Sequence, residues 1–192
     1  ILAYHMFSKS LAEGTGMTKE MLNSLIVFPM IFVAIGMIAC IAGIASLLLR
    51  PKLTDDPHKD LNASTYVAAA GTIVAGFFVS WGMFGSFDVG LLRNTLGFAA
   101  GFVSPWIAST IGVVSGVLIG MVAEYYTSDH FEPTRRLAHA SIEGPALTIT
   151  QGLAVGMKST MLPCIILGMG IIFSYYAAGM YGVAMAAMGM LS

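Results

Sequence analysis

The stretch that decides the fold is 104–128, SPWIASTIGVVSGVLIGMVAEYYTS. Serine followed by proline favours a helix start, because serine can cap the helix and proline lacks the N–H that the first turn leaves unpaired. The next 19 residues, 105–123, carry no charge, and about 20 apolar residues cross a hydrocarbon core. Glu124 and two tyrosines then follow, as is typical of a membrane boundary. The stretch predicts a membrane-spanning helix over 105–126.

The composition of the whole chain agrees with this prediction. Hydrophobic residues make up 57% of the 192 residues and charged residues 10%, whereas soluble domains have about 25% charged residues. The mean hydropathy is +0.82. The net charge of −1 gives no case for a nucleic-acid partner. These values predict an all-α membrane protein.

The apolar runs divide the chain into four complete spans and two partial ones. Asn62 or Ser64 can cap the second complete span, and Gly179 begins a tight turn before the last partial span. A polar loop is expected over 127–140. The fourth complete span would measure about 50 Å as a helix, so it should extend beyond the membrane or bend at Pro163. The predicted spans of this single transmembrane unit are 1–7 (partial), 21–49, 65–84, 105–126, 141–176 and 181–192 (partial).

Lysine and arginine are more frequent in the loops 50–62 and 127–140 than in the loops on the opposite side. The positive-inside rule therefore predicts that these two loops are cytoplasmic. The end of the 105–126 span, with Glu124, is then cytoplasmic too.

Glycines recur at every fourth position in two of the spans. Small residues at this spacing let membrane helices approach backbone to backbone. We expect packing within the chain, and a subunit interface is the alternative. The glycines of these two faces are Gly112, Gly116 and Gly120 in the third complete span and Gly152 and Gly156 in the fourth.

Three charged residues are candidates for coupling or structural roles. Lys158 lies about 25 Å along the span that starts near Ser141, which predicts a position inside the membrane. It could be held by a carboxylate or helix-end carbonyls, take part in ion movement, or reach the interface. Glu124 is either an interfacial carboxylate paired with Arg or Lys, or a gating or coupling residue. Glu143, in the expected first turn of its helix, is favoured by the helix dipole.

The only acidic cluster in the chain, Asp55, Asp56 and Asp60, lies in an expected solvated loop. Hard cations such as Mg²⁺ prefer oxygen ligands, but the pattern does not predict a metal site here. No phosphate-binding loop, nucleophile elbow or dinucleotide fingerprint is present. From the residues alone, we therefore assign no catalytic residue and no metal ligand in this chain.

Several motifs together resemble the membrane-integral, ion-pumping inorganic pyrophosphatases. The similarity covers nearly the whole chain, and the linked EYYTS and GMKS patterns are its most specific part. The motifs are SPW (104–106), IGVVSGVLIG (111–120), EYYTS (124–128), SIEG (141–144), GMKS (156–159) and YGVAMAAMGMLS (181–192).

The resemblance implies a sixteen-helix homodimeric pump in a prokaryotic cell (inner) membrane. Such a pump hydrolyses inorganic pyrophosphate with Mg²⁺, in some members with K⁺, and moves H⁺ or Na⁺ across the lipid bilayer. The chain starts at Ile1 rather than at methionine, and we expect an internal fragment with outer-ring helices and without the catalytic aspartates. Alone, it should be inactive. A fragment of a secondary transporter and a structural membrane subunit are the alternatives.

Overall fold

The computed structural model describes residues 19–48, 57–85, 98–128 and 130–191, and no strand occurs among them. Four of its helices are long and apolar enough to cross a membrane. This confirms the prediction of an all-α membrane protein. The elements are α2 (Lys19–Leu48), α3 (Pro57–Phe84), the 3₁₀ helix η1 (Gly101–Val103), α5 (Ser104–Thr127), α6 (Glu132–Glu143) and α7 (Pro145–Leu191).

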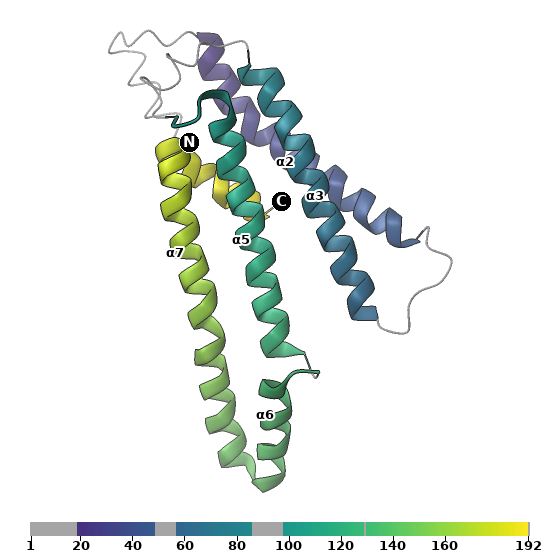
Figure 1. Cartoon of the computed structure of the whole chain (residues 1–192). Helices are drawn as coiled ribbons and strands as arrows, with labels where there is room; N and C mark the ends of the chain where they lie inside the picture. The colour runs from purple at the N-terminus through teal and green to yellow at the C-terminus, as the bar shows by residue number, and fades with distance from the viewer. Residues whose placement is uncertain (1–18, 49–56, 86–97, 129, 192) are drawn as a thin grey trace.

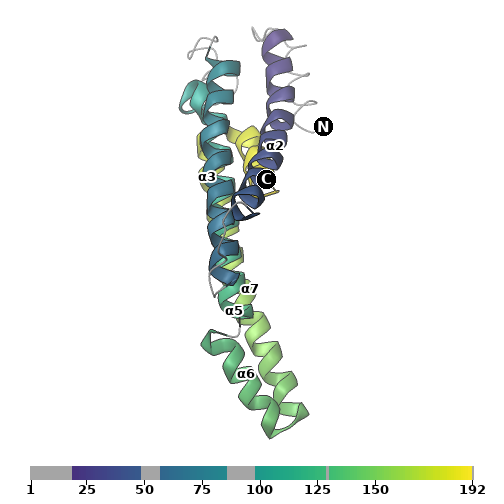
Figure 2. The ribbon, with the colours of Figure 1, turned by 90° about the vertical axis from the view of Figure 1, so that its right-hand side faces the viewer.

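The helices form an elongated bundle of two pairs (Figures 1 and 2). α2 packs on α3, and α5 makes its most extensive contacts with α7. The short α6 lies beside the beginning of α7 at one end of the molecule (Figure 1). α2 ends and α3 begins toward this same end (Figure 1). The arrangement is that of consecutive spans crossing in alternating directions.

Two helix boundaries differ from the sequence predictions. α3 begins at Pro57, so Asn62 and Ser64 lie inside the helix and neither caps it. The expected polar loop at 127–140 is largely the amphipathic helix α6, which starts at Glu132 with a proline in its first turn. The prediction relied on apolar runs, and α6 has none, so this helix was not predicted.

The start of α7 also differs from the prediction. α6 ends at Glu143, and Gly144 separates it from α7 with φ 138° and ψ 164°, a region that is essentially restricted to glycine. Glu143 therefore lies in the last turn of α6, not in the first turn of a long span. The predicted stabilisation by a positive helix N-terminus is wrong, because the C-terminal end of a helix is negative.

α7 is divided into two limbs by a kink. Its backbone leaves helical geometry at Ala178 (φ −147°) and Gly179 (φ 61°), but not at Pro163. The break therefore lies at the predicted Gly179 turn, and the backbone at Pro163 keeps helical geometry. We call 145–177 the first limb and 180–191 the second limb.

The second limb enters the core of the bundle. The Tyr181 hydroxyl donates a hydrogen bond of 3.0 Å to the carbonyl of Leu25 on α2. The ring of Tyr181 lies 5.8 Å from that of Phe98, and Phe84 continues the cluster at 6.5 Å from Phe98. All four of these residues are buried. The burial of these aromatic rings joins α2, α3 and the second limb.

Two hydrogen bonds connect α3 to the segment around the start of α5. The indole N–H of Trp106 donates to the carbonyl of Ile73 at 2.8 Å, and the Ser80 hydroxyl donates to the carbonyl of Phe102 at 2.6 Å. Bonds between helices satisfy polar groups that lipid cannot solvate. They fix the height of α5 relative to α3, and therefore the position of Glu124 at the other end of α5.

Candidate functional site

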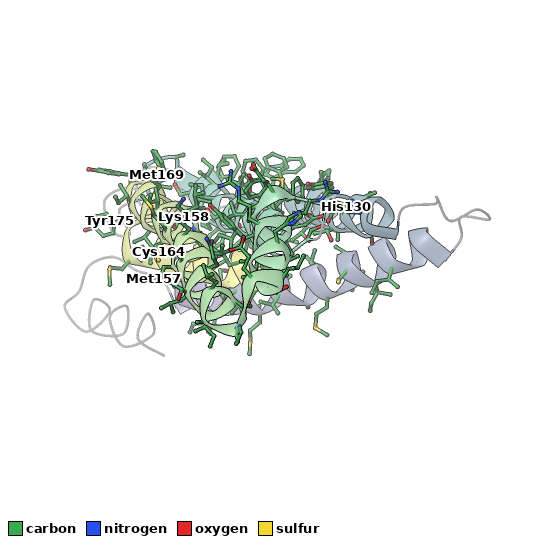
Figure 3. All side chains as sticks on the ribbon, turned by 90° about the horizontal axis from the view of Figure 1, so that it is seen from below. His130, Met157, Lys158, Cys164, Met169 and Tyr175 are labelled. Atoms are coloured by element: carbon green, nitrogen blue, oxygen red, sulfur yellow. The ribbon has the colours of Figure 1, made fainter. Side chains whose placement is uncertain are left out.

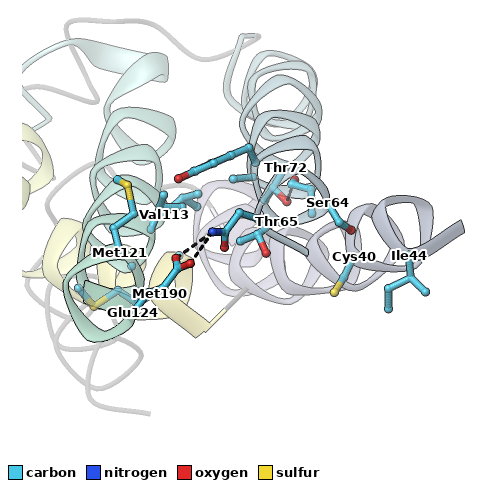
Figure 4. Close-up of a pocket in the computed structure, with 17 residues that line it drawn as sticks. Cys40, Ile44, Ser64, Thr65, Thr72, Val113, Met121, Glu124 and Met190 are labelled. Carbon is cyan, nitrogen blue, oxygen red and sulfur yellow. Dashed lines mark hydrogen bonds between the residues drawn. The ribbon is translucent and has the colours of Figure 1, made fainter. Parts of the chain in front are cut away.

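Glu124, in the last turn of α5, is held by Asn62 of α3. The side-chain amide nitrogen of Asn62 lies 2.8 Å from each carboxylate oxygen of Glu124, as Figure 4 shows. No lysine or arginine partner of Glu124 occurs among the residues whose side chains the structure describes. Because α3 begins at Pro57, it carries Asn62 along its side to the level of Glu124. The Asn62 amide is neutral, so it gives Glu124 hydrogen bonds but no opposing charge.

The pair faces a cavity of about 640 Å³ between α2, α3, α5 and the second limb of α7. Glu124 supplies the only carboxylate among the described residues that line it. Hydroxyl groups on α3 supply most of its other polar atoms, and the remaining lining is mainly apolar. A carboxylate in such a cavity can accept hydrogen bonds or bind a cation. Its polar lining residues include Asn62, Ser64, Thr65, Tyr66, Thr72 and Glu124.

Lys158 faces a second, smaller cavity of about 300 Å³ between α5, α6 and the first limb. Its side chain is exposed, and Figure 3 shows its position on the first limb. Arg136 also lines this cavity and forms an ion pair of 2.6 Å with Glu132. Lys158 has no ion pair among the described residues. The two cavities place Glu124 and Lys158 in different sites, so the structure does not bring these two candidates together.

The depth of Lys158 follows from its distance to the kink. About 20 residues separate Lys158 from Ala178, or about 30 Å of helix, which equals the thickness of a hydrocarbon core. About 20 residues likewise separate Ser104 from Glu124 in α5. Lys158 is therefore level with the end of α5. This position favours the interface among the three alternatives for Lys158.

The glycine face of α5 meets the second limb of α7. A Cβ placed on Gly112 would lie 2.1 Å from the carbonyl oxygen of Ala186, and one on Gly116 would lie 3.6 Å from Met190. A Cβ on Gly120 would have nothing within 4 Å. Gly120 and Gly116 line the larger cavity instead. Close approach of the backbones thus requires glycine at Gly112 but not at Gly120.

The two predicted glycines of the first limb, Gly152 and Gly156, lie away from α5. A Cβ on Gly152 would lie 3.8 Å from Leu137 of α6, and one on Gly156 would have nothing within 4 Å. The close contacts that the sequence analysis missed involve Gly189, where a Cβ would lie 2.4 Å from the Ser109 carbonyl oxygen, and Gly170, at 3.0 Å from the Ser115 hydroxyl. The glycine spacing along one helix does not identify the partner helix. A signal for Gly189 was present in the sequence, because Tyr181, Met185 and Gly189 recur at every fourth position and so share one helix face.

The described residues do not fit the Mg²⁺ that the resemblance implies. No group of three His, Cys, Asp or Glu side chains among them could hold a metal ion. Asp55 and Asp56 lie outside the described residues, and the side chain of Asp60 is not described. We therefore derive no catalytic step through a metal in this part of the chain.

Comparisons with known proteins give one consistent result. The model of the family "Inorganic H+ pyrophosphatase" matches residues 3–192. The chain is 42% identical to a K(+)-stimulated pyrophosphate-energized sodium pump of Thermotoga maritima, over 91% of the chain and 23% of that pump. It is 33% identical to a K(+)-insensitive pyrophosphate-energized proton pump of Moorella thermoacetica, over 87% of the chain and 24% of that pump. The chain thus spans about a quarter of the length of these relatives.

A third relative is covered more fully. The chain is 32% identical to a pyrophosphate-energized proton pump of Rhizobium leguminosarum bv. trifolii, over 88% of the chain and 77% of that relative. The relatives that the chain resembles therefore include both sodium pumps and proton pumps.

Proposed function

Because this chain belongs to the inorganic H⁺ pyrophosphatase family, we propose that it is part of a pump that hydrolyses inorganic pyrophosphate and moves H⁺ or Na⁺ across a membrane. The observation that carries this proposal is the family match over residues 3–192, together with relatives that are named pyrophosphate-energized pumps. Four helices that can cross a membrane support it.

We propose that this part of the pump supports the translocation machinery without performing the hydrolysis. The described residues offer no metal cluster for phosphate chemistry. The catalytic Mg²⁺ site would then lie in parts of the pump outside this chain, with K⁺ as a further ion in K⁺-stimulated members. A homodimer in a prokaryotic inner membrane is the assembly and location that the family resemblance supports.

Glu124 is the best candidate in this chain for a role in coupling. It connects α5 to α3 through Asn62 at the end that we predict to be cytoplasmic. A movement of either helix relative to the other changes the hydrogen bonds to this carboxylate. The competing role is structural: the same bonds fix the ends of two supporting helices.

The full-length parent protein, reconstituted in lipid vesicles, tests the proposed function. Adding pyrophosphate and Mg²⁺ should cause phosphate release and uptake of H⁺ or Na⁺ into the vesicles. The 192-residue segment alone should release no phosphate. Transport by the parent without pyrophosphate hydrolysis would support a secondary transporter and overturn the proposal. Hydrolysis by the isolated segment would overturn the supporting role.

The two roles of Glu124 can be separated in the same vesicles. If Glu124 couples hydrolysis to transport, Glu124→Gln should lower the number of ions moved per phosphate released. If its role is structural, hydrolysis and transport should fall in parallel. The ratio of the two rates is the measurement that decides.

A further inference from the structure

We propose that the cavity between α5, α6 and the first limb of α7 binds the phosphate of an anionic lipid headgroup. This cavity of about 300 Å³ is distinct from the one at Glu124. It brings two cations, two tyrosines and an amide together around one space. The residues that carry the argument are Tyr125, Tyr126, Glu132, Arg136, Gln151 and Lys158.

The charges in the cavity suit a phosphodiester. Lys158 has no ion pair among the described residues. The Nε and one terminal nitrogen of Arg136 donate hydrogen bonds to the Glu132 carboxylate. The other N–H groups of the guanidinium remain available to a ligand. Two cations and one carboxylate give a net charge of +1, which matches the single negative charge of a lipid phosphodiester. Pyrophosphate, with a larger negative charge, would be poorly neutralised here.

The depth of the cavity is that of a headgroup. Lys158 lies about 30 Å along the helix from the kink of α7, which is the thickness of a hydrocarbon core, so we place the kink at one boundary of the core and Lys158 at the other. Tyr125 and Tyr126 end the apolar run of α5 at the same level, as aromatic residues do at membrane interfaces. A lipid phosphate occupies this level of a bilayer.

Hydrogen bonds and ring contacts hold the wall of the cavity in place. The Thr134 hydroxyl of α6 donates to the Tyr126 carbonyl at 3.3 Å. The rings of Tyr125 and Phe131 lie 4.9 Å apart. Both contacts fix the amphipathic α6 against the end of α5. α6 runs alongside the beginning of α7 (Figure 1), and its Glu132 and Arg136 line the cavity.

The surface next to the cavity suits the acyl chains of the same lipid. On the first limb, toward the membrane centre from Lys158, Met161 and Leu162 are exposed. Met169, two turns further, is exposed as well. Lys158 can contact the headgroup of a lipid while the apolar residues on its membrane side contact the acyl chains of the same lipid. A soluble anion has no acyl chain to contact these apolar residues.

Native mass spectrometry of the full-length parent protein with added phosphatidylglycerol or phosphatidylcholine tests this proposal. Lys158→Met and Arg136→Gln should each weaken phosphatidylglycerol binding about fivefold, because a basic residue near an anionic surface contributes on the order of 1 kcal/mol. Glu132→Gln should strengthen it, since it releases Arg136 and removes a negative charge. Phosphatidylcholine should bind more weakly than phosphatidylglycerol.

Arg135→Gln is the matched control, because Arg135 lies on the same helix but does not line the cavity. Arg135→Gln should change the affinity for phosphatidylglycerol by less than twofold. Lys158→Arg, which keeps the positive charge, should retain phosphatidylglycerol binding. Equal losses in Arg135→Gln and Arg136→Gln would show general charge attraction and overturn the site. Unchanged binding in Lys158→Met would also overturn it. Displacement of the lipid by free pyrophosphate would identify a soluble anion as the ligand instead.

Discussion

The two ends of this bundle are built differently. Near the kink of α7, aromatic rings and glycine contacts fill the space between helices: Phe84, Phe98 and Tyr181 are at most 5% exposed. At the opposite end, around Glu124 and Lys158, two cavities separate the helices. We call these the packed end and the open end. Close packing of side chains stabilises the packed end, whereas a few polar contacts connect the helices at the open end.

The difference indicates a division of roles along the membrane normal. Interiors at native packing density resist changes of shape, whereas helices around cavities can change position at lower cost. The candidate coupling residue Glu124 lies at the open end. Substitutions at the packed end should therefore affect stability, and those at the open end should affect activity more than stability.

The largest expected effect is that of Gly112→Val at the packed end. Its Cβ would lie 2.1 Å from the Ala186 carbonyl oxygen, and this backbone atom cannot move without displacing the second limb. We expect a loss of about 3 kcal/mol or more in the free energy of unfolding, measured by thermal unfolding of the parent protein in detergent. Gly120→Val is the matched control, because its Cβ would have nothing within 4 Å. Equal losses in both variants would contradict the packed contact.

Gly179→Ala should have the next largest effect. Gly179 has φ 61° and ψ −148°, a conformation that costs other residues about 1 to 3 kcal/mol. The same thermal unfolding experiment measures it. Gly168→Ala, in the first limb and with open space at its Cβ, should cause no loss. A stable Gly179→Ala protein would show that the kink is not required for the packed end.

Asn62→Ala tests the open end. It leaves the Glu124 carboxylate without its two 2.8 Å contacts, and hydrogen bonds to charged groups are worth about 1.5 to 3 kcal/mol. The open cavity admits water, so we expect a stability loss of about 1 kcal/mol and a larger fractional loss of pyrophosphate-driven transport. A stability loss as large as that of Gly112→Val would remove the distinction between the two ends.

Trp106→Phe should have the smallest effect. It removes the indole donor to the Ile73 carbonyl but keeps the aromatic contact with Phe77, whose ring lies 5.2 Å away. A neutral hydrogen bond contributes about 1 kcal/mol. The loss of unfolding free energy should therefore be about 1 kcal/mol, with hydrolysis and transport kept in their normal ratio. A changed ratio would mean that this contact, too, takes part in coupling.

The sequence predicts the helices of this fold better than their contacts. Apolar runs of about 20 residues identified the four membrane-crossing helices, because burying backbone polar groups in lipid leaves few alternatives. The amphipathic α6 was missed, since it has no apolar run. The sequence also could not show that Gly179 sends the second limb into the core, because a turn gives the position of a change in direction but not the direction itself.

For the candidate site, the sequence identified Glu124 and Lys158 but not their surroundings. Their charges in or beside apolar runs made them visible. Asn62 was taken for a helix cap, because the start of α3 was placed too late. Its bond to Glu124 joins positions 62 residues apart, and no local pattern encodes such a pairing.

The second limb of α7 has a consequence for biosynthesis. Chains are made from the N-terminus, so α2, α3 and α5 enter the membrane before the segment that carries Tyr181 and Met185 exists. The space between these earlier helices stays unfilled until the second limb, which is made after them, inserts there. Correct assembly of this region therefore follows the synthesis of the second limb, and a ribosome that stalls before Gly179 leaves these helices without it.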